Sequence, residues 1–177
     1  MHDKTNNNGI GDGGGGGADA GIQQAVPPLI TFPLCGAHRV NDFCAAKSAA
    51  VEDFLKTKAA DQIQRNFCRV FVLQNPDDPT HVLGYYSLSA FQIERDSMSR
   101  KHADRLGRRT APMVLLGYMG KTDGAQAGMG AWLIADAARR VATVREHLGI
   151  WGLAVEAEND DLGKWYSKPE IGFVIAK

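Results

Sequence analysis

A loop rich in glycine and alanine, GAQAGMG at residues 124–130, stands directly before a segment of helical periodicity, AWLIADAARR. The apolar stretch MVLLGYMGK at residues 113–121 precedes the loop and is typical of a strand. A loop of this kind between a strand and a helix directs several backbone N–H groups toward one point, where the positive end of the helix adds its field. Glycines let an anion come close to the backbone. The sequence therefore predicts either a phosphate-binding loop or a tight turn built from small residues.

The spacing of this loop excludes two common phosphate-binding classes. It does not contain the dinucleotide pattern G-x-G-x-x-G, and no Gly-Lys-Ser/Thr follows it, as a nucleoside triphosphate loop requires.

The chain has 177 residues, which suits one domain with a sizeable core. Lys+Arg and Asp+Glu both number 20, so the formal net charge is zero and any basic patch must be local.

The N-terminal segment, residues 1–28, is polar and contains the run GIGDGGGGGADAG. Such a composition buries too little apolar surface to offset its ordering entropy, so we expect a flexible tail followed by one domain at residues 29–177.

No apolar run approaches the ~20 residues of a membrane span, and no secretory signal pattern is present. The three cysteines form neither an even set nor a C-x-x-C pair. We therefore expect a cytoplasmic protein with reduced thiols, no metal site and no membrane contact.

The remaining segments predict an α/β fold. We expect strands at residues 28–32, 68–74, 81–94, 113–121, 149–158 and 171–176, with a turn at 75–80 between the second and the third. Helices are expected within residues 40–66, at 128–148 and at 159–166, the last capped by Asn159. The strand–loop–helix–strand unit around the glycine loop implies a parallel pair of strands. The prediction is a mixed sheet with helices on both faces.

The order of these elements and the loop resemble the GNAT superfamily of acetyltransferases. In that family the pattern Q/R-x-x-G-x-G/A holds the pyrophosphate of acetyl-CoA, and residues 125–130 match it at Gly128 and Gly130. The first position is Ala125, and Gln126 comes one place later. The resemblance implies a splayed parallel strand pair that holds acetyl-CoA. It also implies these cofactor-binding residues: Met119, Gly120, Lys121, Gln126, Ala127, Gly128, Met129, Gly130, Ala131 and Asn159.

A second family signature is the stretch WYSKPEIGF at residues 165–173. The resemblance makes Tyr166 a general acid that protonates the departing thiolate, while backbone N–H groups of residues 119–121 polarise the thioester carbonyl. A phenol with a pKa of about 10 keeps its proton at neutral pH. The family usually places three residues between this tyrosine and Gly-Phe, whereas this chain has five. The alternative is that Tyr166 is an aromatic residue that only packs at a helix end.

The segments FPLCG, VEDFLKTKA, NFCRVFVL, VLGYYSLSAF and PMVLLGYMG occur in an order that resembles the acetyltransferase toxins of type II toxin–antitoxin pairs. This resemblance implies acetylation of the amino group of aminoacyl-tRNA, a ribbon-helix-helix antitoxin and a possible homodimer. Tyr118 stands where these toxins usually carry an arginine.

The stretch of residues 95–109 has six basic and two acidic residues. We predict that it binds the tRNA substrate, because phosphate contacts dominate such affinity, through Arg95, Arg100, Arg108 and Arg109. The alternative is a solvated charged surface.

No Glu or His stands out as a general base. The amine of an aminoacyl ester has a lowered pKa, so water alone could remove its proton. Two other functions stay open: an acetyltransferase for protein lysines or a small amine, and a GNAT-like scaffold without catalysis.

Overall fold

The computed structural model describes residues 30–106 and 109–174. The predicted tail at residues 1–28, and Arg108, lie outside these residues. The centre of the fold is one five-stranded sheet in the order β1-β2-β3-β4-β5. Its strands are β1 (Thr31–Pro33), β2 (Arg69–Asn75), β3 (Asp78–Glu94), β4 (Thr110–Lys121) and β5 (Gly152–Val155). The first three pairings are antiparallel, and β4 with β5 is parallel.

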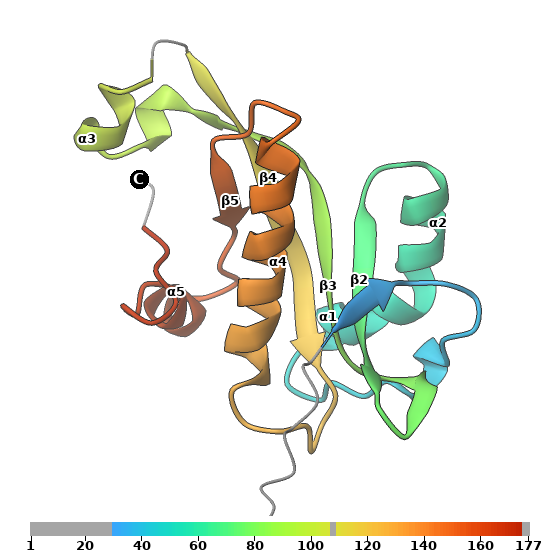
Figure 1. Cartoon of the computed structure of the whole chain (residues 1–177). Helices are drawn as coiled ribbons and strands as arrows, with labels where there is room; N and C mark the ends of the chain where they lie inside the picture. The colour runs from blue at the N-terminus through green and yellow to red at the C-terminus, as the bar shows by residue number, and fades with distance from the viewer. Residues whose placement is uncertain (1–29, 107–108, 175–177) are drawn as a thin grey trace, which may run out of the picture.

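Helices cover both faces of the sheet (Figure 1). One face carries a continuous helical segment made of α1 (Ala49–Asp53), the π-helical turn η2 (Phe54–Lys58) and α2 (Ala59–Gln64). The other face carries α4 (Met129–Arg145), with α5 (Asp160–Tyr166) beside it. Three short elements complete the fold: η1 (Val40–Asp42), η3 (Arg95–Ser97) and α3 (Arg100–Ala103). The predicted mixed sheet with helices on both faces and a parallel pair is confirmed.

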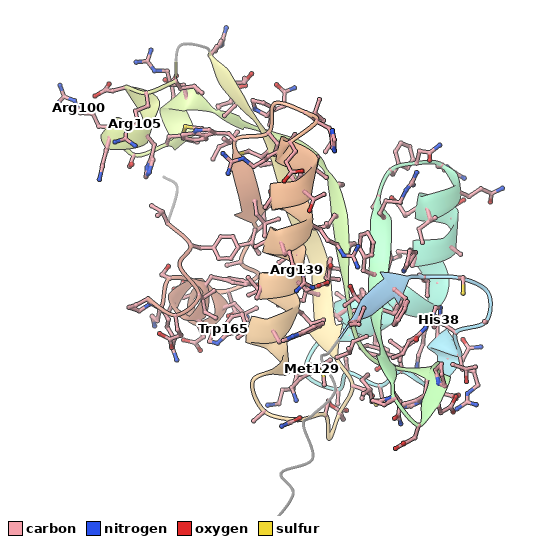
Figure 2. All side chains as sticks on the ribbon, in the orientation of Figure 1. His38, Arg100, Arg105, Met129, Arg139 and Trp165 are labelled. Atoms are coloured by element: carbon pink, nitrogen blue, oxygen red, sulfur yellow. The ribbon has the colours of Figure 1, made fainter. Side chains whose placement is uncertain are left out.

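Each face of the sheet has its own hydrophobic core. The core on the side of α1 and α2 includes Phe43, Phe54, Leu55 and Tyr85. The core on the side of α4 includes Tyr86, Leu116, Leu133, Ile134 and Tyr166. The helical face predicted for residues 128–148 is buried as far as Val141, whereas Val144 and Leu148 are exposed. Figure 2 shows Met129 at the start of α4 and Arg139 further along the same helix.

Some element boundaries differ from the sequence prediction. The β2–β3 turn is tighter than expected, because Asn75 already pairs with Asp78. β5 is shorter than the predicted strand at residues 149–158. The strand predicted at residues 171–176 is not formed over residues 171–174, and residues 175–177 lie outside the described part. The chain instead turns back after α5, with Gly172 at φ 85°, and the ring of Phe173 packs edge-on against Tyr166.

The π-helical turn η2 has an identifiable cause. The hydroxyl of Tyr85 donates a hydrogen bond to the backbone carbonyl of Val51, and the hydroxyl of Thr57 donates to the carbonyl of Asp53 at 2.8 Å. Side-chain donors that enter the carbonyl ladder of a helix disturb its regular pairing. The backbone N–H of Ala59 accordingly bonds five residues back, to Phe54. The wider turn lets Phe54 and Ala59 both be buried against the sheet.

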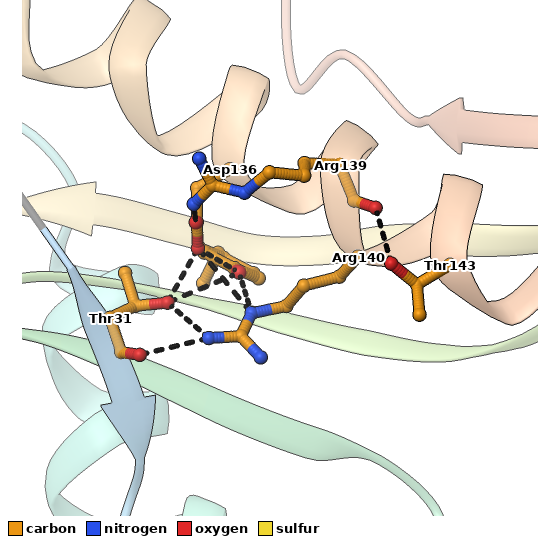
Figure 3. A network of polar contacts seen from close by, with 6 residues as sticks. Thr31, Asp136, Arg139, Arg140 and Thr143 are labelled. Carbon is orange, nitrogen blue, oxygen red and sulfur yellow. Dashed lines mark hydrogen bonds and ion pairs between the residues drawn. The ribbon is translucent and has the colours of Figure 1, made fainter.

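A buried polar network ties α4 to β3 and to β1, the strand at one edge of the sheet (Figure 3). Asp136 is 2% exposed and accepts hydrogen bonds from the hydroxyls of Thr31 in β1 and Tyr86 in β3. Arg139 and Arg140 pair with the same carboxylate. Arg140 also donates to the backbone carbonyl of Thr31 at 2.8 Å. One carboxylate thus joins three separate parts of the chain.

These contacts also set the ionisation of the carboxylate. Burial alone would raise the pKa of Asp136, but the hydrogen bonds from Thr31 and Tyr86 and the charges of Arg140 and Arg139 outweigh it. The pKa is therefore lower than that of an ordinary carboxyl group. A lowered pKa contributes stability that is present above the unfolded value of about 3.9 and is lost as the pH falls through the folded value.

The variant Asp136→Asn should lower the free energy of unfolding at pH 7 by about 1–3 kcal/mol, since the amide presents hydrogens to donors that need an acceptor. Urea unfolding at a series of pH values measures this. The difference from the parent should shrink as the pH falls below ~4, where the parent carboxylate becomes protonated. The exposed Asp77→Asn is the control and should change little. An equal loss at the acidic and the neutral end of the series would contradict the ionic role of Asp136.

Candidate functional site

The parallel strands β4 and β5 separate halfway along β4. Their pairing runs from Met113 with Gly152 to Leu116 with Val155. β4 then continues to Lys121, while the chain after β5 becomes exposed and turns toward α5. Within the described residues, the segment 117–121 has β3 as its only strand partner. Among the described residues, the edge of residues 117–121 that faces away from β3 is therefore open, since no strand pairs with it.

A β-bulge lies where the strands separate. Tyr86 pairs with Met119, but Leu88 pairs with Leu116, so β4 has one extra residue in this interval. The hydroxyl of Ser87 accepts a hydrogen bond from the backbone N–H of Tyr118 at 2.9 Å, which gives this donor a partner inside the irregular ladder. Bulges bend a strand and redirect its side chains. This bulge is the local reason why β4 can leave β5.

The bulge also changes the alternation of side chains along β4. Leu116 and Met119 are three residues apart, yet both pack with the core on the side of α4. Tyr118 instead stacks on Phe54, on the side of α1 and η2. Gly120 faces the same side as Tyr118, and a β-carbon at this position would collide with the side chain of Val51 in α1. Gly120 thus has a packing reason to be glycine, independent of any bound cofactor.

The first half of the glycine loop is anchored by several hydrogen bonds. The carboxylate of Asp123 accepts a hydrogen bond from the backbone N–H of Ala46 at 3.1 Å, and the backbone N–H of Asp123 donates to the carbonyl of Cys44 at 2.7 Å. The ammonium of Lys121 donates to the carbonyl of Ala125 at 2.6 Å. Ala125 itself packs against the core on the side of α4. The residue that departs from the family pattern therefore helps to hold the base of the loop.

The second half of the loop is open and leads into α4. Gln126, Ala127 and Gly128 are exposed, and Gly128 has φ 83°, a conformation that favours glycine. Among the described residues, no side chain caps the start of α4, and its first turn has no acidic residue. The starts of α1 and α5 differ, since Ser48 and Asn159 cap them. The N–H groups at the start of α4 are thus available to an anion, as the phosphate interpretation of the loop requires.

The helix α5 packs against the start of α4. Atom Cη2 of Trp165 would lie 3.4 Å from a β-carbon at Gly130, and Figure 2 shows Trp165 beside the N-terminal part of α4. The ring of the next residue, Tyr166, contacts those of Trp165 and Phe173. The predicted N-cap of this helix is confirmed, since the side chain of Asn159 accepts a hydrogen bond from the backbone N–H of Leu162 at 3.0 Å.

Tyr166 is 8% exposed, and its burial raises the pKa of the phenol above the ordinary value. In the part of the chain that the structure describes, no side-chain oxygen is both buried and without a partner. Among these same residues, no hydrogen-bond partner is found for the hydroxyl of Tyr166. The result is a packed ring near the start of α4 whose hydroxyl keeps its proton at neutral pH.

The basic residues lie at the other end of β4. Arg95 and Arg109 flank the pair of Glu94 with Thr110, whereas the glycine loop follows the end of β4 at Lys121. A strand of this length spans about 35 Å. Figure 2 shows Arg100 and Arg105 on this distal arm, residues 95–106 and 109, far from the labelled start of α4. Arg95 and Arg109 lie 3.9 Å from acidic partners, so part of the local charge is paired.

The structure therefore divides the predicted site residues into two groups. The first group gathers around the open edge of β4 and the start of α4: Met119, Gly120, Lys121, Gln126, Ala127, Gly128, Met129, Gly130, Ala131, Asn159 and Tyr166. The second group lies on the distal arm and consists of Arg95, Arg100 and Arg109.

Three contacts at this site could not be read from the sequence. They are the bond of Ser87 to the bulge, the packing of Trp165 on Gly130 and the stacking of Tyr118 on Phe54. Each of them joins segments that are far apart in the chain, and no local pattern of residues signals it.

Other kinds of site find little support within residues 30–106 and 109–174. No group of three or more potential metal ligands is present there. The three cysteines, all in this part of the chain, are free thiols. No described helix has both the length and the hydropathy to cross a membrane.

Comparison with known proteins gives clear structural neighbours, although no protein-family model matches the chain. A Tyr→Phe mutant of KacT is similar with a TM-score of 0.77 and 27% identity, over 84% of this chain and 88% of the other. AtaT complexed with acetyl-methionyl-tRNAfMet has a TM-score of 0.75 and 27% identity, over 84% and 88%. A Tyr→Phe mutant of the AtaT toxin, bound to the C-terminus of the antitoxin AtaR and acetyl-CoA, has a TM-score of 0.64 and 26% identity, over 78% and 81%.

KacT and AtaT are GNAT acetyltransferase toxins of type II toxin–antitoxin systems. The chain has the GNAT fold of these toxins. The resemblance seen in its sequence motifs is therefore confirmed over most of the chain. The separation of β4 from β5 and the uncapped start of α4 are the features on which a GNAT site would be built in this chain.

The variant Gly128→Asp should weaken binding of acetyl-CoA by about tenfold or more, because it puts a carboxylate where the helix end and N–H groups would hold phosphate. The matched control is Gly124→Asp, since Gly124 also has positive φ and open space around it. Both variants should lose similar stability from backbone strain. Isothermal titration calorimetry measures the affinities, and equal affinities for the two variants would contradict a phosphate site at the start of α4.

Proposed function

We propose that this protein is an acetyl-CoA-dependent N-acetyltransferase that acetylates the amino group of an aminoacyl-tRNA. The observation that carries the proposal is the open edge of β4 beyond Leu116, directly beside an exposed and uncapped helix start. In this proposal the pyrophosphate of acetyl-CoA lies on the N–H groups of residues 126–131. Gly128 allows the close approach, and Lys121 supports the base of the loop.

The chemistry needs a polarised carbonyl and a proton for the leaving group. Acetyl-CoA supplies an activated thioester. The amine nitrogen forms a bond to the acetyl carbon, the carbon–sulfur bond breaks, and the amine loses a proton to water. Backbone N–H groups of residues 119–121 can stabilise negative charge on the acetyl oxygen. Tyr166 gives its proton to the thiolate and then regains one from water. The raised pKa of its phenol keeps it protonated at neutral pH before the transfer.

Two observations support an aminoacyl-tRNA as the acceptor. AtaT, which is similar over most of the chain, has been seen with acetyl-methionyl-tRNAfMet. The distal arm presents Arg100, Lys101 and Arg105 as exposed basic residues, and none of the ion pairs in the described part of the chain includes them. Phosphate contacts from such an arm would hold the tRNA while its acylated end reaches the open edge of β4.

We further propose that the protein is a toxin acting in the cytoplasm and that an antitoxin binds it, as AtaR binds AtaT. A ribbon-helix-helix antitoxin and a homodimer remain predictions from the resemblance. The decisive assay incubates the protein with labelled acetyl-CoA and, separately, with charged tRNA, free amino acids or bulk protein. Label on charged tRNA supports the proposal. Label only on protein or amino acids favours the lysine or small-amine acetyltransferase, and absence of acetyl-CoA binding favours the scaffold.

The variant Tyr166→Phe should leave acetyl-CoA affinity nearly unchanged and lower turnover by about 10²–10⁴-fold, the usual effect of a placed general acid. It keeps the ring contacts with Trp165 and Phe173 but removes the proton. Single-turnover acetylation of charged tRNA measures the change. The control Tyr86→Phe removes a hydroxyl of the Asp136 network, so it should lower stability without a comparable loss of turnover. A Tyr166→Phe protein with parental turnover would overturn the acid assignment.

The double variant Arg100→Glu, Arg105→Glu should weaken tRNA binding and leave acetyl-CoA binding intact, since both residues lie on the distal arm. The salt dependence of tRNA binding should become shallower by roughly one unit of log–log slope per lost phosphate contact. Filter binding at several salt concentrations measures this slope. Arg65→Glu, which changes an exposed residue at the end of α2, is the control. An unchanged slope and rate would show that the arm does not bind tRNA.

A further inference from the structure

We propose that Tyr118, supported by Phe54, forms a wall of the acceptor site and selects aminoacyl groups with a large, uncharged apolar side chain. This inference rests on the proposed function, since it concerns the acceptor of that reaction. Tyr118 lies in the bulge of β4, directly before the segment where the thioester carbonyl would be held. A side chain attached to the attacking amine must pass within reach of the residues around this point.

The direction of approach follows from the two faces of β4. The start of α4 and the ring of Tyr166 lie on the α4 side, so a bound donor would fill that side. The amine attacks the acetyl carbon while the thiolate leaves, and it cannot enter through the space that the donor occupies. The acceptor must therefore come from the other face of β4, where the bulge places the side chain of Tyr118.

The surface that Tyr118 presents there is aromatic and rigid. Its ring lies 4.0 Å from the ring of Phe54 with an angle of 11° between the planes, and Phe54 in turn stacks on Tyr85 at 6.2 Å. Phe54 and Tyr85 are buried, whereas Tyr118 is 38% exposed. One face of Tyr118 is thus fixed by the core, and its remaining surface is free to contact a ligand. An aromatic surface of this kind binds apolar side chains of the acceptor, because the contact removes apolar area of both partners from water.

The charges near this wall disfavour a cationic acceptor side chain. Lys58 at the end of η2 pairs with Asp53 at 2.6 Å. Asp53, and to a smaller extent the nearby Tyr118, raise the pKa of this ammonium group. A second ammonium or guanidinium placed against the ring would meet the charge of Lys58 and find Asp53 already paired. Neutral apolar groups carry no such cost.

The π-helical turn explains how Phe54 and Lys58 both come close to Tyr118. The hydroxyls of Tyr85 and Thr57 bond to carbonyls of the preceding turn, which widens at this point. Turns of this type are frequent at functional sites. The wide turn and the β-bulge, two irregular elements far apart in the sequence, thus meet at one aromatic contact.

The test uses one tRNA body charged with different amino acids, so that only the side chain varies. Rates of acetylation are measured as kcat/KM for phenylalanyl, methionyl, alanyl, lysyl and aspartyl forms. The parent should prefer the phenylalanyl and methionyl forms over the others by about tenfold or more. Tyr118→Ala should remove most of this preference, and Tyr118→Phe should keep it. Acetyl-CoA affinity should not change in either variant.

The matched control is Phe32→Ala in β1, a similarly exposed aromatic residue in the strand at the opposite edge of the sheet, which should alter no acceptor preference. If Tyr118→Ala does not fold, Tyr118→Thr removes the aromatic surface but keeps a residue that favours strands, and it should lose the preference in the same way. An equal loss on every acceptor, or an unchanged preference, would overturn the role of Tyr118 while leaving the proposed function intact. A parent that acetylates none of the charged tRNAs would instead overturn the proposed function and this inference with it.

Discussion

The bulge at residues 117–118 of β4 is the constraint on which the site depends. In a regular β4, Met119 would face α1 instead of the core beneath α4, because a strand alternates its side chains at every residue. One extra residue, with the N–H of Tyr118 bonded to the hydroxyl of Ser87, accompanies the end of the parallel pairing and sends Tyr118 to one face and Met119 to the other. The end of the parallel pairing and the separation of the proposed donor side from the proposed acceptor side therefore have a single structural origin.

The position of the glycine loop is linked to the position of Tyr166. Trp165 packs over Gly130 in the first turn of α4, and the ring of Tyr166 contacts that of Trp165. A β-carbon at residue 130 would lie within ordinary van der Waals contact of the indole. The two motifs that carry the family resemblance touch each other in the fold.

The elements around this site could be predicted from the sequence, because their signals are local. The glycine loop, the apolar strand before it and the cap at Asn159 are all readable within a few residues. The bulge was not predictable, since it depends on Ser87 of another strand. The buried network of Asp136 was equally hidden within an apolar helix face, because its partner Thr31 is 105 residues away. The strand expected at residues 171–176 rested on apolar composition alone, and over residues 171–174 the packing of Phe173 replaces it.

The geometry of β4 bears on the size of the acceptor. Its first residues carry the distal arm, and its last residues lead into the glycine loop, about 35 Å away along the strand. A free amino acid or a lysine side chain at the open edge could not touch Arg100 or Arg105 at the same time. A folded RNA can do so, with its backbone on the arm and its acylated end at β4. If the arm contributes to the rate, the substrate must therefore be a macromolecule long enough to follow this strand from one end to the other.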